Sequence, residues 1–539
     1  MRIRSRKNLK RKNALIVFLF LLPIIILLSY ASVILYILYD INSFVYRIDA
    51  PVTNHFYPMS AINDNRLEEM ARIFDYRNRV YNSPVGFPVD VTFTNYNYDT
   101  VASWSHTDNG ALHAAYACAA ACYKYHWAKE NGMTEDLTNA TNEIRHYVQA
   151  FNDLIAAPNG GLGINPKTND WYPGTISRFA VNYTNAVKYH PFMLEDHPRH
   201  HNGTGAYSNW RVRFKTSRDE VSGYYLAWAC VLKFVTGDDP VSKWCVEQVK
   251  TQIGQVLNDW RYRSNWLVLD WHGYPTGSDI NSATWQLAAL RIGATAWPDE
   301  YGSMYQYAAA KMGSMEGATM GDLWNSANEY YAYMLAANTM FTLVLLEDNP
   351  ELRYHYIKNW ENTMYRIVRY HRNAYFNMLH LVFMSMLTPQ QRLGLQNPDY
   401  SDEEILWDVK DQLWRFNESN WCPIRNYNLT TRPHSTRETS TNPLIAAQEI
   451  NPVIDKWNTW FATSPIGAIY SWVGTDLFSF DEDLYKHPRT VSEHWAQHMI
   501  WQSNSFKKEG GNPDENGLTE PPGTSYTTVY WWARAFNIF

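Results

Sequence analysis

The sequence predicts an all-α protein in which helical hairpins close into a double ring, preceded by one transmembrane helix. Apolar residues recur at helical spacing along most of the chain from residue 65 onward. Strand patterns are sparse and short, as in WLVLD at 266–270. Turn signals such as APNGG (157–161) and TGDDP (236–240) separate the helical stretches. A long uncharged run near the N-terminus supplies the membrane span.

The N-terminal segment predicts how the chain sits in a membrane. Residues 1–13 carry seven basic side chains and no acidic one, and the uncharged run continues to Tyr39. Since Lys and Arg stay on the cytoplasmic side, we expect a cytoplasmic tail at 1–13, a span at 14–39 and a stalk at 40–64, with the rest extracellular or lumenal. The alternative is a cleaved signal peptide, whose apolar part is normally only about 7–15 residues long and precedes an A-x-A site.

The helical segments beyond the stalk are joined alternately by short turns and by long irregular loops. This arrangement is typical of stacked hairpins, and about a dozen helices favour a closed double ring whose loops form a cleft at one end. No low-complexity linker divides the chain, so we expect residues 65–539 to form one domain, least regular at 416–490. The expected helices are 65–80, 109–130, 135–156, 219–236, 240–260, 280–296, 300–312, 322–347, 350–372, 374–387, 401–415, 446–463, 491–503 and 525–535.

The composition narrows the class of partner. The net charge is −6 and basic residues do not cluster beyond the N-terminus, which argues against nucleic-acid binding. Core packing explains most of the 23 Trp and 38 Tyr, and the excess favours a carbohydrate partner, because such rings line sites that hold sugars. N-x-[ST] triplets, which permit glycosylation on the non-cytoplasmic side, start at Asn139, Asn182, Asn202, Asn417 and Asn428.

Neither a cofactor nor a metal is predicted. Five cysteines are too few for a disulfide framework, although Cys230 and Cys245 could pair across a hairpin. Cys118 and Cys122 are expected to be small buried residues of an Ala-rich helix. The His-rich stretch 197–205 lacks a carboxylate at helical ligand spacing, which favours a solvated loop over a metal site. GxSxG, P-loop and dinucleotide fingerprints are absent.

Two polar segments lie at the starts of predicted helices. In WSHTDNG, Asp108 suits an N-cap, and the functional alternative places it beside Trp104 and His106 at a cleft. In FKTSRDE, Ser217 and Glu220 have the spacing of a capping box, which leaves Arg218 and Asp219 without a structural role. A carboxylate near another in a partly dry cleft has a raised proton affinity, as a general acid requires.

Two further segments combine aromatic residues with tight turns. In LVLDWHGYPTGSD, Asp279 is expected to cap the helix that follows, and Trp271 and His272 belong either to a structured turn or to the rim of a cleft. The C-terminal EPPGTSYTTVYWWARAF places Tyr526 on the last helix, where closing the ring is the favoured role. Asn328 and Glu329 begin a helix near the middle of the chain, with core, cap and cleft roles all open.

These segments together resemble a known superfamily. The TDNG and SRDExxG helix starts, the LDxxGxPT turn and the PGTxYxxxYWxxR ending are similar to those of the (α/α)6-toroid (six-hairpin) glycosidase-like superfamily, over about residues 100–539. The resemblance implies an (α/α)6 toroid. It also implies activity on carbohydrates, since members hydrolyse glycosidic bonds, usually with inversion through two carboxylic acids, or cleave uronic-acid polysaccharides by elimination.

The first functional hypothesis is a membrane-anchored, outward-facing glycoside hydrolase. Asp219 would act as general acid or base with Asp108 as its partner, about 6.5–9.5 Å away in an inverting enzyme, and Glu220 in reserve. The residues expected to bind the sugar are Trp104, His106, Arg178, Arg218, Trp271, His272 and Tyr526. One alternative is a lyase that uses His106 or Tyr526 with Arg218, and another is a non-catalytic surface protein that binds glycans.

Overall fold

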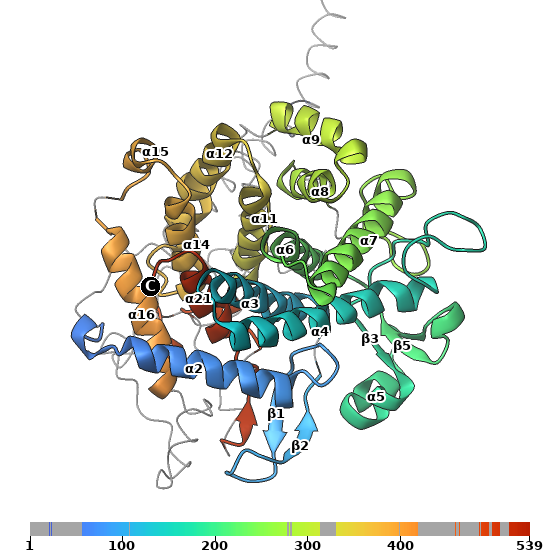
Figure 1. Ribbon diagram of the computed structural model, residues 1–539, viewed down its shortest axis with the longest axis horizontal. Helices are drawn as coiled ribbons and strands as arrows, with labels where there is room; N and C mark the ends of the chain where they lie inside the picture. Colours follow the sequence, from blue (N-terminus) through green and yellow to red (C-terminus); the bar gives the residue numbers. More distant parts are fainter. Residues whose placement is uncertain are drawn as a thin grey trace, which may run out of the picture.

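The computed structural model describes residues 56–106, 108–276, 283–312, 330–397, 399–418, 487–494, 498–506 and 517–539, with a few single residues elsewhere. Most of these residues are helical, and strands are few and short (Figure 1). The predicted all-α class is therefore confirmed. Within these ranges no helix is both long and apolar enough to cross a bilayer. The expected span at 14–39 and the tail before it lie outside them.

One set of helices is buried over most of its length and forms the interior. The Ala-rich helix α3 is enclosed on nearly all sides, and it packs against α6 and α21. A Cβ atom on Gly223 of α6 would lie 2.7 Å from the Cα of Leu112, so α3 and α6 approach each other closely. The inner helices are α3 (Gly110–Glu130), α6 (Arg218–Phe234), α8 (Ala283–Ala296), α11 (Tyr331–Leu346), α14 (Ala374–Ser385) and α21 (Thr524–Ala535).

A second set of helices lies around the first (Figure 1). Several have strong N-terminal caps: the Asp239 side chain accepts two backbone N–H groups at the start of α7, and Ser401 forms a capping box with Glu404 at the start of α16. Along the chain each outer helix precedes an inner one. The outer helices are α2 (Asp64–Arg77), α4 (Thr134–Asn159), α7 (Pro240–Tyr262), α9 (Pro298–Met312), α12 (Pro350–Trp360) and α16 (Asp402–Trp414).

Two small antiparallel sheets lie on the helices. The first has the order β2 (Val101–Trp104), β1 (Val91–Phe93) and β6 (Thr519–Glu520), and it joins the two ends of the described chain. The second has the order β3, β5 and β4, and in space it lies next to the N-terminal ends of α3 and α6. Its strands, with the short helices beside them, are β3 (Phe179–Asn182), α5 (Tyr183–Tyr189), η4 (Pro191–Leu194), β4 (His200–Asn202) and β5 (Trp210–Arg213).

Several predicted elements are wrong. Residues 266–270 are not a strand, because Trp266 has a φ of +66° and only Leu269 forms a bridge, to Pro275. The helix predicted at 491–503 contains only short 3-10 turns among its described residues, η9 (Val491–Glu493) and η10 (Ile500–Gln502). The backbone N–H of Ile500 donates to Ser525 Oγ instead of to a preceding turn. By contrast, the helix predicted at 350–372 is present over most of its length, because α12 continues without a break as the π-helical η7 (Glu361–Tyr365) and α13 (Arg366–Val368).

The end of the predicted stalk belongs to the folded domain. The backbone N–H of Tyr57 donates to Asp411 at 2.7 Å, and the indole of Trp407 donates to the Tyr57 carbonyl at 2.6 Å. The ring of Phe56 is buried against Trp407. These contacts tie residues 56–57 to α16, so any free stalk ends before them.

The described cysteines are all reduced and buried, including Cys230 and Cys245, for which pairing had remained open. Cys118 and Cys122 are buried in α3, as expected. Asp279, Asn328 and Glu329 and the helix predicted at 446–463 lie outside the described ranges.

Candidate functional site

Four inner helices contribute to one hydrogen-bonded network, which lies in the amino-terminal half of α3, α6 and α14 and at the middle of α11. The Asn338 amide on α11 donates to the Tyr116 hydroxyl on α3 at 3.0 Å, and the Tyr375 hydroxyl on α14 donates to the Asn338 carbonyl oxygen at 2.7 Å. The Asn338 amide also lies 3.5 Å from Ser222 Oγ on α6. All four side chains are buried. We call these four residues, with Asp219 and Gln502, the amino-end cluster.

Asp219 and Gln502 are the more accessible members of the amino-end cluster. Asp219 lies in the first turn of α6, and its backbone carbonyl accepts the Ser222 hydroxyl at 2.8 Å. The Gln502 amide lies 3.5 Å from the Tyr116 hydroxyl. Burial raises the pKa of Tyr116, and the charge of Asp219 adds to this shift. The Asp219 carboxylate is thus close enough to act electrostatically on a buried network of neutral hydroxyl and amide groups.

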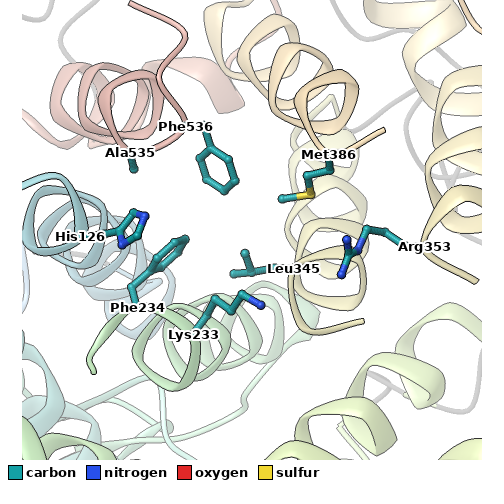
Figure 2. A pocket seen from close by; sticks show the side chains of 8 residues that line it. All are labelled: His126, Lys233, Phe234, Leu345, Arg353, Met386, Ala535 and Phe536. Atoms are coloured by element: carbon teal, nitrogen blue, oxygen red, sulfur yellow. The ribbon is translucent and has the colours of Figure 1, made fainter. Parts of the chain in front are cut away.

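The carboxyl halves of the same helices meet at a second place. A pocket of about 280 Å³ is bordered there by residues late in each helix (Figure 2). They include His126 on α3, Phe234 on α6, Leu345 on α11, Met386 after α14 and Phe536 after α21. Along α3, α6, α11 and α14, the chain passes the amino-end cluster first and reaches the pocket later, in or just after the last part of the helix. These four helices therefore run in the same direction, with the two places at opposite ends.

A histidine pair with a carboxylate lies beside the start of α3. His498 Nδ1 is 3.4 Å from an oxygen of Asp90, and the rings of His498 and His113 are 4.9 Å apart. Burial raises the pKa of Asp90, with His498 opposing, and burial lowers the pKa of His113 well below its ordinary value, with His498 adding to the shift. His498 Nε2 and His113 Nδ1 have no hydrogen-bond partner among the residues that the structure describes. Both ring nitrogens are buried, so each is an enclosed polar atom without a described partner.

Arg178 connects the starts of α3 and α6. Its guanidinium donates to the Asp108 carbonyl at 3.0 Å, to Asn109 Oδ1 at 2.7 Å and to the Lys215 carbonyl at 2.6 Å. Its Nη1 also lies 3.5 Å from an oxygen of Glu220. Because all of these contacts are to the protein itself, Arg178 has a structural role and fixes the starts of α3 and α6 relative to each other.

Glu220 is fully buried in the first turn of α6. Its Oε2 accepts the backbone N–H of Ser217 at 3.1 Å and the Ser217 hydroxyl at 2.8 Å, and the predicted capping box is confirmed. Burial raises the pKa of Glu220 to about 7; the Arg178 charge opposes this shift and the Asp219 charge adds to it. Its position is that of a helix cap, enclosed from solvent.

Asp108 does not cap α3. The N-cap is Asn109, which makes no capping hydrogen bond with its side chain. The Asp108 carboxylate instead forms ion pairs with Arg213 on β5 and, at 3.6 Å, with Arg199, while half of the side chain stays exposed. The negative charge of Asp108 is therefore balanced by two arginines, one on β5 and one just before β4.

The aromatic and histidine residues predicted to bind sugar fall into separate groups. Trp104 donates from its indole to the Tyr81 carbonyl and packs on Tyr189, and His106 packs on Phe192. The second group is built on Trp271, which is 45% exposed, and contains His272, His201 and Phe214. The guanidinium of Arg218 lies 5.8 Å from the Trp285 ring centre, at the start of α6.

Tyr526 lies away from these groups. It is fully buried, its hydroxyl donates to the Leu67 carbonyl at 2.8 Å, and its ring packs on Phe74 and Tyr530. It connects α21 to α2. Its burial leaves no surface for a sugar.

The sequence patterns missed the residues that the fold brings together. Asn338 and Tyr375 lie inside predicted helices, where a polar residue surrounded by apolar ones was the only available signal. His113, His498 and Asp90 lie far apart in the chain and match no spacing motif. Among the described residues no group of His, Cys, Asp or Glu has the arrangement of a metal site. The His-rich stretch 197–205 is not simply a solvated loop, as expected, because it contains β4, and His200 in that strand is buried.

Comparison with known proteins gave no match, whether to protein-family models, to curated proteins or to solved structures.

Proposed function

We propose that the inner and outer helices form an (α/α)6 toroid. Outer and inner helices alternate along the chain from α2 to α21. Four inner helices meet through Tyr116, Ser222, Asn338 and Tyr375, and they meet again seven to twelve residues later around the pocket. Ten residues of helix span roughly 15 Å. Parallel inner helices that share an axis over such a length support this arrangement.

We further propose that the protein acts on glycans, as a glycoside hydrolase, and that the reaction takes place at the amino-end cluster. The observation that carries this proposal is the position of Asp219, a carboxylate that is only partly buried, next to the buried Tyr116–Asn338–Tyr375 network. Fixed hydroxyl and amide groups beside a carboxylate suit the binding of sugar hydroxyls. Asp219 would transfer the proton at the glycosidic bond.

The second acid of the hydrolase is proposed to be Asp90, acting with His498. The Asp108 carboxylate is already engaged by two cations, Arg213 and Arg199. Glu220 is enclosed in its capping box. Asp90 instead has a raised pKa and contacts a histidine whose other nitrogen has no described partner. His113 lies one turn before Tyr116 on α3 and so connects this pair to the amino-end cluster.

The location of the enzyme is also a proposal. The basic tail and apolar run at 1–39 favour a single-pass membrane protein with its N-terminus in the cytoplasm. The domain from residue 56 onward would then face the outside or a lumen. Extended glycans are found there, which agrees with the proposed substrate.

The substitution Asp219→Asn tests the proposed reaction. Asn keeps the shape of the side chain and suits the first turn of a helix, so folding should survive. Turnover of a glycan substrate should fall by about 10²–10⁴-fold, which is the usual contribution of general acid–base catalysis. Unchanged turnover would assign Asp219 to structure alone.

A non-catalytic glycan-binding protein is the second candidate. The exposed Trp271, with His201 and His272 against its ring, offers a flat aromatic face on the surface. Glycan binding that depends on Trp271, without hydrolysis of any member of a broad glycan panel, would favour this candidate. In the lyase alternative, Tyr526 is unsuited to be the base because it is enclosed in the interior, and His106 is the remaining candidate.

A further inference from the structure

The pocket at the carboxyl ends of the inner helices has apolar walls and two cations. Phe234, Leu345, Met386 and Phe536 form the walls, and the side chains converge on a common hollow (Figure 2). Its volume of about 280 Å³ is close to the lower end of the range for ligand sites, roughly 300–1,000 Å³. It lies at the opposite end of the helices from the amino-end cluster and has no part in the proposed reaction.

The cations of this pocket are arranged without a matching anion. Lys233 and Arg353 point toward each other from two sides of the hollow (Figure 2). No carboxylate is among the described lining residues, and Lys233 makes no hydrogen bond or ion pair within the described structure. Glu347 lies six residues before Arg353, and its carboxylate is engaged elsewhere, by the Tyr305 hydroxyl and the Asn349 backbone N–H.

Helix dipoles explain only part of this arrangement. Lys233 is in the last turn of α6, where a cation offsets the partial negative charge of the helix end. Arg353 belongs to the first turns of α12, where a cation is not favoured by its own helix. Its guanidinium donates to the Glu347 carbonyl at the end of α11, and this contact fixes it at the pocket. Two like charges directed at one apolar hollow are most stable with an anion between them.

We propose that this pocket binds a small organic monocarboxylate with a flat or short apolar body. The carboxylate would lie between Lys233 and Arg353, and the body would pack against Phe234, Phe536 and Met386. A more highly charged anion such as a phosphate suits the site less, because the carbonyl ends of α6 and α11 carry partial negative charge and the walls are apolar. Burial lowers the pKa of His126, so this third basic group stays neutral at pH 7.

Binding of 2-naphthoate to the full chain, held in lipid nanodiscs, tests this proposal. The neutral 2-naphthamide serves as the isosteric control probe, and empty nanodiscs serve as the blank. Saturable binding of naphthoate is expected, with the amide at least about tenfold weaker, because a hydrogen bond to a charged group is lost. Equal binding of both probes, or uptake of naphthoate that does not saturate above the blank, would overturn the proposal.

Two variants locate the site. Lys233→Gln removes one exposed charge, so the fold is kept, and naphthoate should bind about tenfold or more weakly while the amide is unaffected. Lys243→Gln, an exposed lysine on α7 away from the pocket, should leave both probes unchanged. Phe536→Leu should weaken both probes, since it removes part of the wall. Wild-type naphthoate binding by Lys233→Gln would reject the assignment, whatever the outcome of the glycan experiments.

Discussion

Arg178 Nη1 lies 3.5 Å from an oxygen of Glu220, and through this contact the segment before β3 holds the first turn of α6. The same guanidinium binds the Asp108 carbonyl at the start of α3. The two helix starts that carry Asp108 and Asp219 are thus joined by one side chain. The position of the Asp219 carboxylate therefore depends on the contact between Arg178 and the buried Glu220, which is the next residue along α6.

Glu220→Gln should change how stability depends on pH. The folded state holds a proton on Glu220 up to a pKa of about 7, whereas the unfolded chain releases it near 4.5. This group therefore stabilises the fold below about pH 4.5, and its contribution is lost as the pH rises through 7. Gln keeps the capping box and does not titrate, so the variant should gain up to about 3 kcal/mol relative to wild type between pH 5 and pH 8.

Denaturant unfolding at several pH values measures that change. The matched control is Glu404→Gln, which alters the same capping-box position in α16, where the side chain is not fully buried. It should show little pH dependence. If the curves of wild type and Glu220→Gln run parallel from pH 5 to pH 8, Glu220 is ionised throughout.

Asp108→Asn should affect stability slightly and catalysis little. The change removes the anion that faces Arg213 and Arg199. Because Asp108 is about half exposed, water already screens these pairs, and the cost should be within about 1 kcal/mol. Turnover should stay within tenfold of wild type in the assay used for Asp219→Asn. A loss as large as that of Asp219→Asn would instead make Asp108 the second acid.

His498→Gln tests the proposed proton-transfer pair. Gln retains a polar side chain but cannot carry a proton between Asp90 and a ligand. Turnover should fall by about 10²-fold or more, and one limb of the pH–rate profile should disappear. His146→Gln is the control, since His146 contacts only the Ser83 carbonyl and the Tyr147 ring in the described structure. A variant with an unaltered pH profile would exclude His498 from the reaction.

Tyr526→Phe should destabilise the protein without altering substrate binding. The substitution removes the hydrogen bond that the Tyr526 hydroxyl donates to the Leu67 carbonyl, at a cost of about 0.5–1.5 kcal/mol. Thermal unfolding should record this loss, while KM for a glycan substrate stays constant. Tyr116→Phe offers the comparison, because it removes a hydroxyl from the amino-end cluster and should raise KM. A raised KM for Tyr526→Phe would place that residue in the site after all.

The predicted topology can be tested in sealed vesicles that keep the cytoplasmic side inward. Seven basic residues before the apolar run favour an N-terminus in the cytoplasm. External protease should therefore digest the chain beyond about residue 40 and spare the tail and span. Protection of the large domain would show the opposite orientation.

Local patterns predicted most of the helices. The Ala-rich run of α3 and the Ser217–Glu220 capping box lie where the periodicity and the cap spacing placed them. These signals act over one or two turns of helix, so the local sequence carries them completely. The same reasoning failed at 491–503, because the hydrogen-bond partners of that segment, Gln412 and Ser525, come from distant helices.

The sequence by itself determined the helical class, the capping box at the start of α6 and the basic N-terminal tail with its apolar run. Only the tertiary structure decided which polar side chains meet. Asn338 finds Tyr116 and Tyr375 because three helices from separate parts of the chain pack side by side. Burial then separates Glu220, enclosed as a cap, from its neighbour Asp219, which keeps contact with solvent. Adjacent carboxylates look alike in the sequence, and their surroundings in the fold make them chemically different.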